Sequence, residues 1–429
     1  MSDSIALRSP GPLHASVRPP GSKSLTNRAL ILAALAHGES RLRGALNADD
    51  TVLMRGCLDA LGVEVRDDDD DDGLHVVGAG GAPQWEGVPS LHVGLAGTVA
   101  RFMTAVLAAA PGESRLDGTE RMRERPMAML IDALREQGGQ LQCLGTEGAL
   151  PLNIGPHSSR LKGGTVRLAR PASSQFVSAL VLAATLAEQP TTIVLEQGTP
   201  ARPYVDMTLD AVRAFGGDAR WRDSNSLSVE PSRLTGQEYA VEPDASGASY
   251  FLALAAIHGG TITIPGIGSG SVQGDAAFAH ALGRMGANVK QTHDTTVVEG
   301  TGALRGGEFD FADTPDMTLT LAVAAAHAQG PTTITGVGIL RHHESDRIAA
   351  IATELRKLGV TVDERDDGLV ITPPQGGLHP GATVATYEDH RMAMALSLVG
   401  DIVVQDPGCV AKTYPGYFDE LRNLGMVRR

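Results

Sequence analysis

The sequence predicts an α/β protein with two domains, each built from three copies of one α/β motif. Three observations support this prediction. The chain has 429 residues, which is more than one ordinary hydrophobic core accommodates. Ala/Leu-rich helical runs recur about every 70 residues, which indicates a duplicated supersecondary motif. A β-rich stretch follows most of these runs, so helices and strands alternate along the chain.

Two helices are expected in most copies of the motif. The first is an Ala/Leu-rich run, and the six runs begin near Ala29, Arg101, Phe176, Tyr250, Thr318 and Arg391. The second is amphipathic and ends in a Leu-containing turn followed by glycine, a common residue at a helix C-terminus. Four copies have this ending, with Gly62, Gly286, Gly359 and Gly425.

Strands are expected between and after these helices, where apolar residues alternate with polar ones. The clearest stretches are 190–195, 260–265, 331–335, 359–363 and 369–372. The polar segment Gly236–Asp244 separates the third copy from the fourth, so we place the domain boundary near residue 241. Because the first copy starts only at about Gly21, we expect a first lobe of residues 21–241. The second lobe then contains residues 1–20 and 242–429.

Composition and charge exclude several classes of protein. Hydrophobic residues make up 42% of the chain and the formal net charge is −14, which is typical of a globular protein and unlike a sequence-independent nucleic-acid binder. The three cysteines lack metal-binding or disulfide spacing, which favours a reducing compartment. Neither a signal peptide nor a membrane span is evident. We therefore expect a cytoplasmic protein that binds neither nucleic acid nor membrane. A monomer is a further expectation.

An acidic run, Asp67–Asp72, lies between two short strand-like stretches. Like charges repel one another and remain hydrated. The run is therefore interpreted as a solvated hairpin loop rather than as a binding site.

Polar clusters precede the six Ala/Leu-rich runs. They are GSKSLTNR (21–28), GLAGTVAR (94–101), ASSQF (172–176), DASGAS (244–249), PDMT (315–318) and EDHR (388–391). Unpaired backbone N–H groups and the helix dipole attract anions at such positions, although Ser, Thr and Asp there are equally ordinary helix caps. Basic residues accompany the clusters: Lys23, Arg28, Arg101, Arg125, Arg347, Arg391 and Lys412. If these helix starts converge, they form an anion-attracting cleft in an acidic protein.

Two competing motifs are not supported. The segment GSKS lacks the spacing of a nucleotide-binding P-loop. The triplet His342–His343–Glu344 resembles a metal site, but adjacent side chains in an extended backbone point to opposite faces. We expect no metal and no cofactor.

The chain resembles the 5-enolpyruvylshikimate-3-phosphate synthase family over essentially its full length. The stretches that carry the resemblance are GSKSLTNRA, AGTVAR, RMRERPM, SSQF, RPYVDMT, DASGASYFLA, ESDRIA, EDHRMAMA and AKTYPGYF, in family order. The resemblance implies an inverted, barrel-like α/β fold of six βαβαββ-type repeats, three in each domain. It also implies that the two domains close on substrates bound in a cleft between them.

The resemblance implies an enolpyruvyl transfer from phosphoenolpyruvate to shikimate 3-phosphate, which requires carboxylate acid–base groups and phosphate-binding cations. The implied catalytic residues are Lys23, Asp316, Glu344 and His390. The implied phosphoenolpyruvate-binding residues are Lys23, Gly97, Arg125, Gln175, Arg347, Arg391 and Lys412. The implied shikimate 3-phosphate-binding residues are Lys23, Ser24, Arg28, Ser173, Ser174, Gln175, Tyr204, Asp316 and His343.

Four positions depart from the usual family pattern. They are Leu95 in place of Asn, Phe102 in place of Pro, Ala201 in place of Ser, and His343 in place of Lys. The first two lie beside the implied phosphoenolpyruvate pocket. We therefore predict reduced sensitivity to glyphosate, the herbicide that inhibits the family.

Two alternatives are considered. The related UDP-N-acetylglucosamine enolpyruvyl transferases carry a cysteine in a mobile loop, whereas residues 118–126 contain none. A catalytically silent scaffold of the same fold is the second alternative. The presence of all the implied catalytic and cationic residues argues against it.

Overall fold

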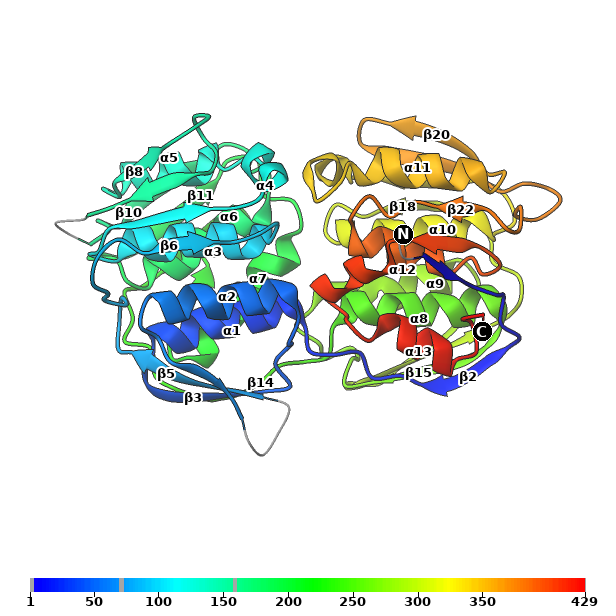
Figure 1. The fold of residues 1–429 in the computed structure, drawn as a ribbon, viewed down its shortest axis with the longest axis horizontal. Helices are drawn as coiled ribbons and strands as arrows, with labels where there is room; N and C mark the ends of the chain where they lie inside the picture. Colours follow the sequence, from blue (N-terminus) through cyan, green and yellow to red (C-terminus); the bar gives the residue numbers. More distant parts are fainter. Residues whose placement is uncertain (1–3, 69–72, 157–159, 429) are drawn as a thin grey trace. The chain divides into compact units, whose positions relative to one another are not determined.

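The computed structural model describes residues 4–68, 73–156 and 160–428, and the chain folds into two compact lobes (Figure 1). The first lobe contains residues 21–241. The second lobe contains residues 242–429 together with the N-terminal segment through Pro20. The chain therefore passes between the lobes twice, after Pro20 and after Val241.

Three four-stranded sheets form the first lobe, with strand orders β14-β3-β5-β4, β6-β7-β9-β8 and β10-β11-β13-β12. In each sheet the first two strands of this order run parallel and the other pairs run antiparallel. The strands are β3 (His37–Arg43), β4 (Val65–Asp67), β5 (Gly73–Ala79), β6 (Ser90–His92), β7 (Ser114–Asp117), β8 (Leu141–Cys143), β9 (Leu152–Ile154), β10 (Gly164–Leu168), β11 (Thr191–Leu195), β12 (Ala219–Trp221), β13 (Ser226–Val229) and β14 (Glu238–Ala240).

The second lobe has two sheets of the same pattern, β2-β15-β17-β16 and β18-β19-β21-β20, and a three-stranded sheet, β1-β23-β22. Strands β1 and β2, from the N-terminal segment, each add one strand to a sheet of this lobe. The strands are β1 (Ser4–Ala6), β2 (Leu13–Ser16), β15 (Gly260–Pro265), β16 (Asn288–Gln291), β17 (Thr295–Gly300), β18 (Glu308–Asp310), β19 (Thr332–Thr335), β20 (Thr361–Arg365), β21 (Gly368–Thr372), β22 (Thr383–Val384) and β23 (Val403–Gln405).

The helices follow the paired pattern expected from the sequence. Those of the first lobe are α1 (Lys23–Leu35), α2 (Asp49–Ala60), α3 (Gly97–Ala109), α4 (Glu120–Glu124), α5 (Ala128–Glu136), α6 (Ser174–Ala184) and α7 (Arg202–Ala214). Those of the second lobe are α8 (Ala245–His258), α9 (Phe278–Arg284), α10 (Thr318–Ala326), α11 (Arg347–Lys357), α12 (His390–Ser397) and α13 (Tyr417–Asn423). Four 3-10 helices in the second lobe are η1 (Gly274–Ala277), η2 (Pro315–Met317), η3 (Gly338–His342) and η4 (Pro407–Lys412).

Three Ala/Leu-rich helices fill the centre of each lobe. In the first lobe α1, α3 and α6 are buried along most of their length, and α3 packs against α6. In the second lobe α8, α10 and α12 are buried in the same way. A helix that is apolar on all sides is stable only inside a core, which explains why the polar residues of these helices are concentrated at their ends.

The predicted starts of these central helices were mostly too late. Thr318 is the first residue of α10, but the other five helices begin one to six residues before the predicted start. The polar residues before each Ala/Leu run are themselves helical, because side chains such as Ser22, Ser173, Asp244 and Asp389 accept backbone N–H groups and cap the helix. The apolar run therefore marks only part of each helix, since polar residues before it, such as Arg28 and Ser249, are buried as well.

The predicted ends of the amphipathic helices are confirmed. Gly62, Gly286, Gly359 and Gly425 follow α2, α9, α11 and α13, and all four have positive φ angles, between 76° and 107°. Glycine adopts this conformation without the steric cost that a Cβ imposes.

Of the acidic run, residues 69–72 lie outside the described residues. The flanking strands β4 and β5 pair antiparallel, and the N–H of Asp68 donates to the carbonyl of Gly73. No helix within residues 4–68, 73–156 and 160–428 has the length and apolarity needed to cross a bilayer.

Candidate functional site

The start of α1 presents Lys23 beside a buried carboxylate. Ser22 caps the helix, and its hydroxyl accepts the backbone N–H of Leu25. The ammonium group of Lys23 lies 3.1 Å from Oδ2 of Asp50, near the start of α2, and the Asp50 side chain is only 3% exposed. Asp50 therefore limits the positions that the Lys23 ammonium occupies.

Two buried guanidinium groups meet the start of α3 at Gly97. A Cβ at position 97 would lie 2.7 Å from Nη1 of Arg125 and still closer to Arg101, so a side chain there would displace the two guanidinium groups. Arg101 Nη1 donates to Oε1 of Gln175 at 2.9 Å. Arg125 is 5% exposed and donates to the carbonyl of Leu95 at 3.3 Å.

Arg125 is the more unusual of the two cations. Among the residues that the structure describes, no carboxylate forms an ion pair with it, and its Nε has no hydrogen-bond partner. A buried charge is costly unless a counter-charge is present, and the N-terminus of α3 adds a further partial positive charge. The start of α3 therefore favours an anionic ligand.

Arg28 is buried within the first lobe. Its guanidinium donates to Thr208 Oγ1 (2.8 Å), to Ser178 Oγ (3.2 Å) and to the carbonyls of Ser24 (2.9 Å) and Tyr204 (2.9 Å). Burial lowers the pKa of Arg28 to about 10, which still leaves it charged at neutral pH. Arg28 thus connects the helices α1, α6 and α7 and orients the backbone at two predicted substrate-binding residues.

The remaining predicted residues of the first lobe lie at the starts of α6 and α7. Ser173 caps α6 by accepting the N–H of Gln175 at 3.2 Å, and Ser174 is the first residue of the helix. Tyr204 lies in the first turn of α7. Ala201 precedes this helix in a left-handed conformation, with φ of 51°, and offers no side-chain cap.

Arg347 is the centre of an ionic network in the second lobe. Its side chain is 2% exposed and contacts three carboxylates: Asp389 (2.7 Å from Nε), Asp316 (2.9 Å from Nη1) and Glu344 (3.0 Å from Nη2). These carboxylates raise the pKa of Arg347 and outweigh the opposing effect of burial. Residues at the starts of α10, α11 and α12 therefore converge on one cation.

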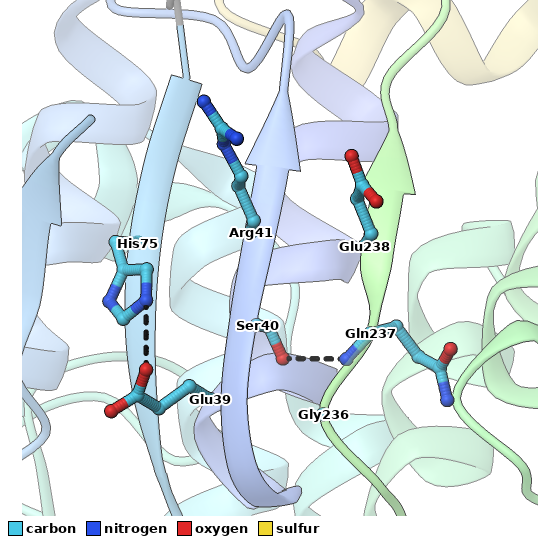
Figure 2. Close-up of a pocket in the computed structure, with 7 residues that line it drawn as sticks. All are labelled: Glu39, Ser40, Arg41, His75, Gly236, Gln237 and Glu238. Atoms are coloured by element: carbon cyan, nitrogen blue, oxygen red, sulfur yellow. Dashed lines mark hydrogen bonds and ion pairs between the residues drawn. The ribbon is translucent and has the colours of Figure 1, made fainter. Parts of the chain in front are cut away.

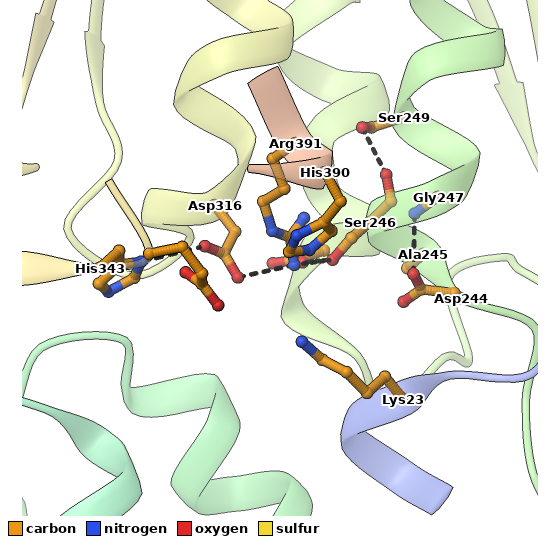
Figure 3. Close-up of polar contacts among 12 residues, drawn as sticks. Lys23, Asp244, Ala245, Ser246, Gly247, Ser249, Asp316, His343, His390 and Arg391 are labelled. Atoms are coloured by element: carbon orange, nitrogen blue, oxygen red, sulfur yellow. Dashed lines mark hydrogen bonds and ion pairs between the residues drawn. The ribbon is translucent and has the colours of Figure 1, made fainter. Parts of the chain in front are cut away.

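Two further cations complete the network. Arg391 Nη2 lies 2.8 Å from Oδ2 of Asp316, and Lys412 Nζ lies 3.1 Å from Oε1 of Glu344. Figure 3 shows Asp316 between His343 and Arg391. Burial alone would raise the pKa of Asp316, but Arg391 and Arg347 lower it to about 2.

The two histidines of the predicted set also lie in this network. His343 Nδ1 accepts from Nη1 of Arg347 at 2.9 Å and lies 3.8 Å from Asp316. His390 is 1% exposed, and its Nδ1 lies 3.6 Å from Oδ1 of Asp389. The neighbouring His342 ends the 3-10 helix η3, whereas His343 has an extended backbone, so the extended conformation assumed for this triplet was wrong at His342.

Sequence reasoning named neither Asp389 nor Asp50 as a site residue. Asp389 accepts from Arg347, from the hydroxyl of Ser345 (3.0 Å) and from the N–H of Arg391 (3.0 Å). An aspartate directly before a basic helix start is a detectable signal, but it equally fits an ordinary cap. Only the fold shows that both carboxylates hold predicted site cations.

A polar pocket lies on the sheet β14-β3-β5 of the first lobe (Figure 2). Its lining consists of Glu39, Ser40, Arg41, His75, Gly236, Gln237 and Glu238. The charged groups pair with each other or with neighbours, as His75 does with Glu39 at 3.1 Å. None of the predicted site residues lines this pocket.

Comparison with known proteins connects this geometry to a family. A 3-phosphoshikimate 1-carboxyvinyltransferase of Vibrio atlanticus is 42% identical over 434 residues, covering 99% of this chain and 100% of the relative. A protein of the same name from Cupriavidus taiwanensis is 44% identical over 417 residues, covering 94% of this chain and 95% of the relative.

Solved structures agree with these relatives. An EPSP synthase structure from Acinetobacter baumannii has a TM-score of 0.82 at 25% identity and covers 100% of both chains. The match confirms the predicted two-domain α/β fold. Residues 7–421 match the family described as EPSP synthase (3-phosphoshikimate 1-carboxyvinyltransferase), and the chain therefore belongs to the EPSP synthase family.

Proposed function

We propose that Arg125, Arg347, Arg391 and Lys412 bind phosphoenolpyruvate in this enzyme and that Gly97 lies beside it. The activity itself follows from the family: the chain is a 3-phosphoshikimate 1-carboxyvinyltransferase, which transfers an enolpyruvyl group to the 5-hydroxyl of shikimate 3-phosphate and releases phosphate. The residue roles are the part that the chain's own geometry supports.

The buried Arg125 carries the proposal. It is a desolvated cation without a carboxylate partner among the described residues, and it lies against Gly97 at the positive end of α3. Phosphoenolpyruvate has a planar carboxylate and a phosphate, and both accept paired hydrogen bonds from guanidinium. Lys23 and Gln175 are further proposed ligands from the same lobe.

Shikimate 3-phosphate is proposed to bind a set of hydroxyl, amide, carboxylate and basic groups. These groups are Lys23, Ser24, Arg28, Ser173, Ser174, Gln175, Tyr204, Asp316 and His343. Hydroxyls and the N-terminus of α6 suit a phosphate ester, because unpaired N–H groups at a helix start bind anions. Arg28 supports this set mainly by orientation, because its guanidinium already donates to Ser24 and Tyr204 carbonyls.

Asp316 and Glu344 are the proposed proton-transfer pair. The addition step needs a proton on the methylene carbon of phosphoenolpyruvate and removal of one from the attacking hydroxyl, which gives a tetrahedral intermediate. The elimination step then removes a proton from the new methyl group as phosphate leaves. With a pKa of about 2, Asp316 is ionised but only weakly basic. A substrate anion bound to Arg391 and Arg347 offsets their charge, so the pKa of Asp316 rises and it becomes a better base.

Glu344 lies between Arg347 and Lys412, which places it among the proposed phosphoenolpyruvate ligands. This position favours Glu344 as the group near the methylene carbon. Lys23 is proposed to stabilise the departing phosphate, and His390 completes the proposed catalytic set. The net charge of −14 supports our further expectation that the enzyme has no nucleic-acid partner. We also propose a cytoplasmic monomer without a membrane partner.

The decisive experiment mixes the purified protein with phosphoenolpyruvate and shikimate 3-phosphate and measures phosphate release, with UDP-N-acetylglucosamine as the alternative acceptor. We expect release with shikimate 3-phosphate only. Lys23→Met and Glu344→Gln should each lower kcat by at least about 100-fold with an unchanged circular dichroism spectrum. Arg365→Gln, which removes an exposed cation paired with Asp363, is the control and should have no effect. Near-normal turnover in either test variant would remove that residue from the mechanism.

A further inference from the structure

The segment before α12 contains two consecutive non-glycine residues in a left-handed conformation. Tyr387 has φ of 57° and Glu388 has φ of 55°. Side chains with a Cβ rarely adopt this region, because the Cβ approaches the following carbonyl oxygen. Such strain persists only where surrounding contacts impose it, and it is frequent beside functional sites.

A buried carboxylate of α11 supplies those contacts. Glu354 is fully buried. Its Oε1 accepts the hydroxyl of Tyr387 at 2.6 Å, and its Oε2 accepts the backbone N–H of Ala385 at 3.1 Å. Lys357, which is partly exposed, donates to the same Oε2 at 2.6 Å and balances the charge.

The residues that follow the strained pair belong to the proposed active site. Asp389 caps α12, accepts two hydrogen bonds from Arg347, and is followed directly by His390 and Arg391. Arg391 in turn contacts Asp316 (Figure 3). A rotation at Tyr387 or Glu388 would therefore change the direction in which α12 begins.

The helix α11 holds both ends of this arrangement. Its first residue, Arg347, binds Asp389. Glu354 lies seven residues later on the same face of the helix and binds the backbone of Ala385, in the segment that precedes Asp389. We propose that Glu354 is a positioning residue for phosphoenolpyruvate binding: its carboxylate holds residues 385–388 in the strained turn that aims Arg391. This inference rests on the proposed function, because it assumes that Arg391 binds phosphoenolpyruvate.

Two variants test the inference in the full-length enzyme. Tyr387→Phe removes one hydroxyl and keeps the ring. Glu354→Gln keeps the shape of the side chain but replaces the carboxylate, which accepts from Ala385 and Lys357, with an amide that itself carries donors. We expect the KM for phosphoenolpyruvate to rise about fivefold to twentyfold in Glu354→Gln and less in Tyr387→Phe, which loses only one hydrogen bond. The KM for shikimate 3-phosphate should change less than about twofold in both.

A purely structural role of Glu354 gives a different result, because a smaller folded fraction lowers apparent kcat and leaves both KM values unchanged. Rescue provides a second distinction. Glycine adopts positive φ without strain, so Glu388→Gly in the Glu354→Gln background should recover most of the lost affinity for phosphoenolpyruvate. Arg365→Gln, which removes an exposed cation paired with Asp363, is the control and should retain the wild-type KM values.

A reference variant separates the two proposals. If Arg391→Lys raises the KM for phosphoenolpyruvate while Glu354→Gln and Tyr387→Phe leave it unchanged, the positioning role is wrong and the proposed function stands. If Arg391→Lys also leaves that KM unchanged, the proposed role of Arg391 in binding phosphoenolpyruvate and the positioning role of Glu354 are both wrong. Should Glu354→Gln fail to fold, Tyr387→Phe decides, since its substitution removes only a hydroxyl group.

Discussion

A single guanidinium group, that of Arg347, shows how individual residues determine the chemistry of the second lobe. Burying one charge is costly, but here a cation meets three carboxylates, and two further cations balance those carboxylates. The arrangement holds Asp316 ionised and keeps the proposed phosphate ligands fixed before substrate arrives. We therefore expect removal of one member of the network to affect both stability and the proposed ligand binding.

Arg347→Met should destabilise the second lobe by about 3–5 kcal/mol, because it leaves Asp389 buried beside two other carboxylates without the central cation. The measurement is urea denaturation followed by far-UV circular dichroism. Arg365→Met, which removes an exposed ion pair with Asp363, should change the unfolding free energy by less than about 1 kcal/mol. Equal effects of the two substitutions would contradict the network as the source of stability.

The departures Leu95 and Phe102 lead to an inhibitor prediction. Phe102 is fully buried, and the guanidinium of Arg28 lies 5.3 Å from its ring, whereas the carbonyl of Leu95 accepts from Arg125. We expect glyphosate to inhibit this enzyme more weakly than it inhibits relatives with Asn and Pro at these positions. Leu95→Asn should lower the inhibition constant by about twofold to tenfold, equivalent to one added hydrogen bond.

Inhibition constants measured side by side with a glyphosate-sensitive relative provide the check. The KM for phosphoenolpyruvate of Leu95→Asn should be determined in parallel, so that a general change in anion binding is distinguished from a change in inhibitor affinity. An inhibition constant already as low as that of the sensitive relative would refute the prediction.

At the scale of elements, the central helices use their two ends differently. Their N-termini carry the caps and cations of the proposed site, whereas the C-termini of α8, α10 and α12 are associated with histidines. His258 ends α8 and lies 2.8 Å from the carbonyl of Leu398, just after α12. His327 follows α10, and its ring centroid is 5.8 Å from that of His258. Burial lowers the pKa of both histidines, that of His327 to about 4.

These histidines predict an acid-sensitive second lobe. In the unfolded chain His327 has a pKa of about 6.5, whereas in the folded chain its pKa is about 4. Between these values the unfolded state binds the proton more readily, so the free energy of unfolding decreases as the pH falls below about 6.5. His327→Phe should reduce the fall in unfolding free energy between pH 7 and pH 5 by about 1–2 kcal/mol. His280→Phe, an exposed site on α9, is the control. Identical pH profiles for wild type and His327→Phe would exclude this histidine as the cause.

At the scale of the whole molecule, each lobe has its own hydrophobic core. The buried cluster of the first lobe, around α1, α3 and α6, shares no residue with that around α8, α10 and α12. Both tryptophans, Trp85 and Trp221, belong to the first lobe. Their fluorescence therefore reports on the folding of that lobe alone, while circular dichroism reports on both.

A fragment of residues 21–241 should fold cooperatively without the rest of the chain, because its three sheets and its core lie within that range. Urea denaturation followed by tryptophan fluorescence is the measurement, and a single cooperative transition is expected. The fragment should release no phosphate from phosphoenolpyruvate, since Asp316, Glu344 and Arg347 belong to the other lobe. A broad, non-cooperative transition would show that the first lobe depends on the second.

Much of the fold and of the proposed site is visible in local sequence. Ala/Leu runs, glycines after amphipathic helices and alternating strands are short-range patterns, so they predicted the copies and the helix ends. The polar residues at the helix starts indicated the position of the proposed anion site, because helix caps and anion sites use the same residue types. The first residues of the helices were less predictable, because capping residues are polar and a search for apolar runs does not include them.

The sequence by itself determined the α/β class, the repeated motif and the family, because each depends on residues close together in the chain. Only the tertiary structure decided which charges meet. Asp389 contacts Arg347 from 42 positions away, and Asp50 contacts Lys23 from the next helix. Buried Glu354 and the left-handed turn at Tyr387 were equally invisible, because desolvation and backbone strain depend on packing between distant segments rather than on residue type.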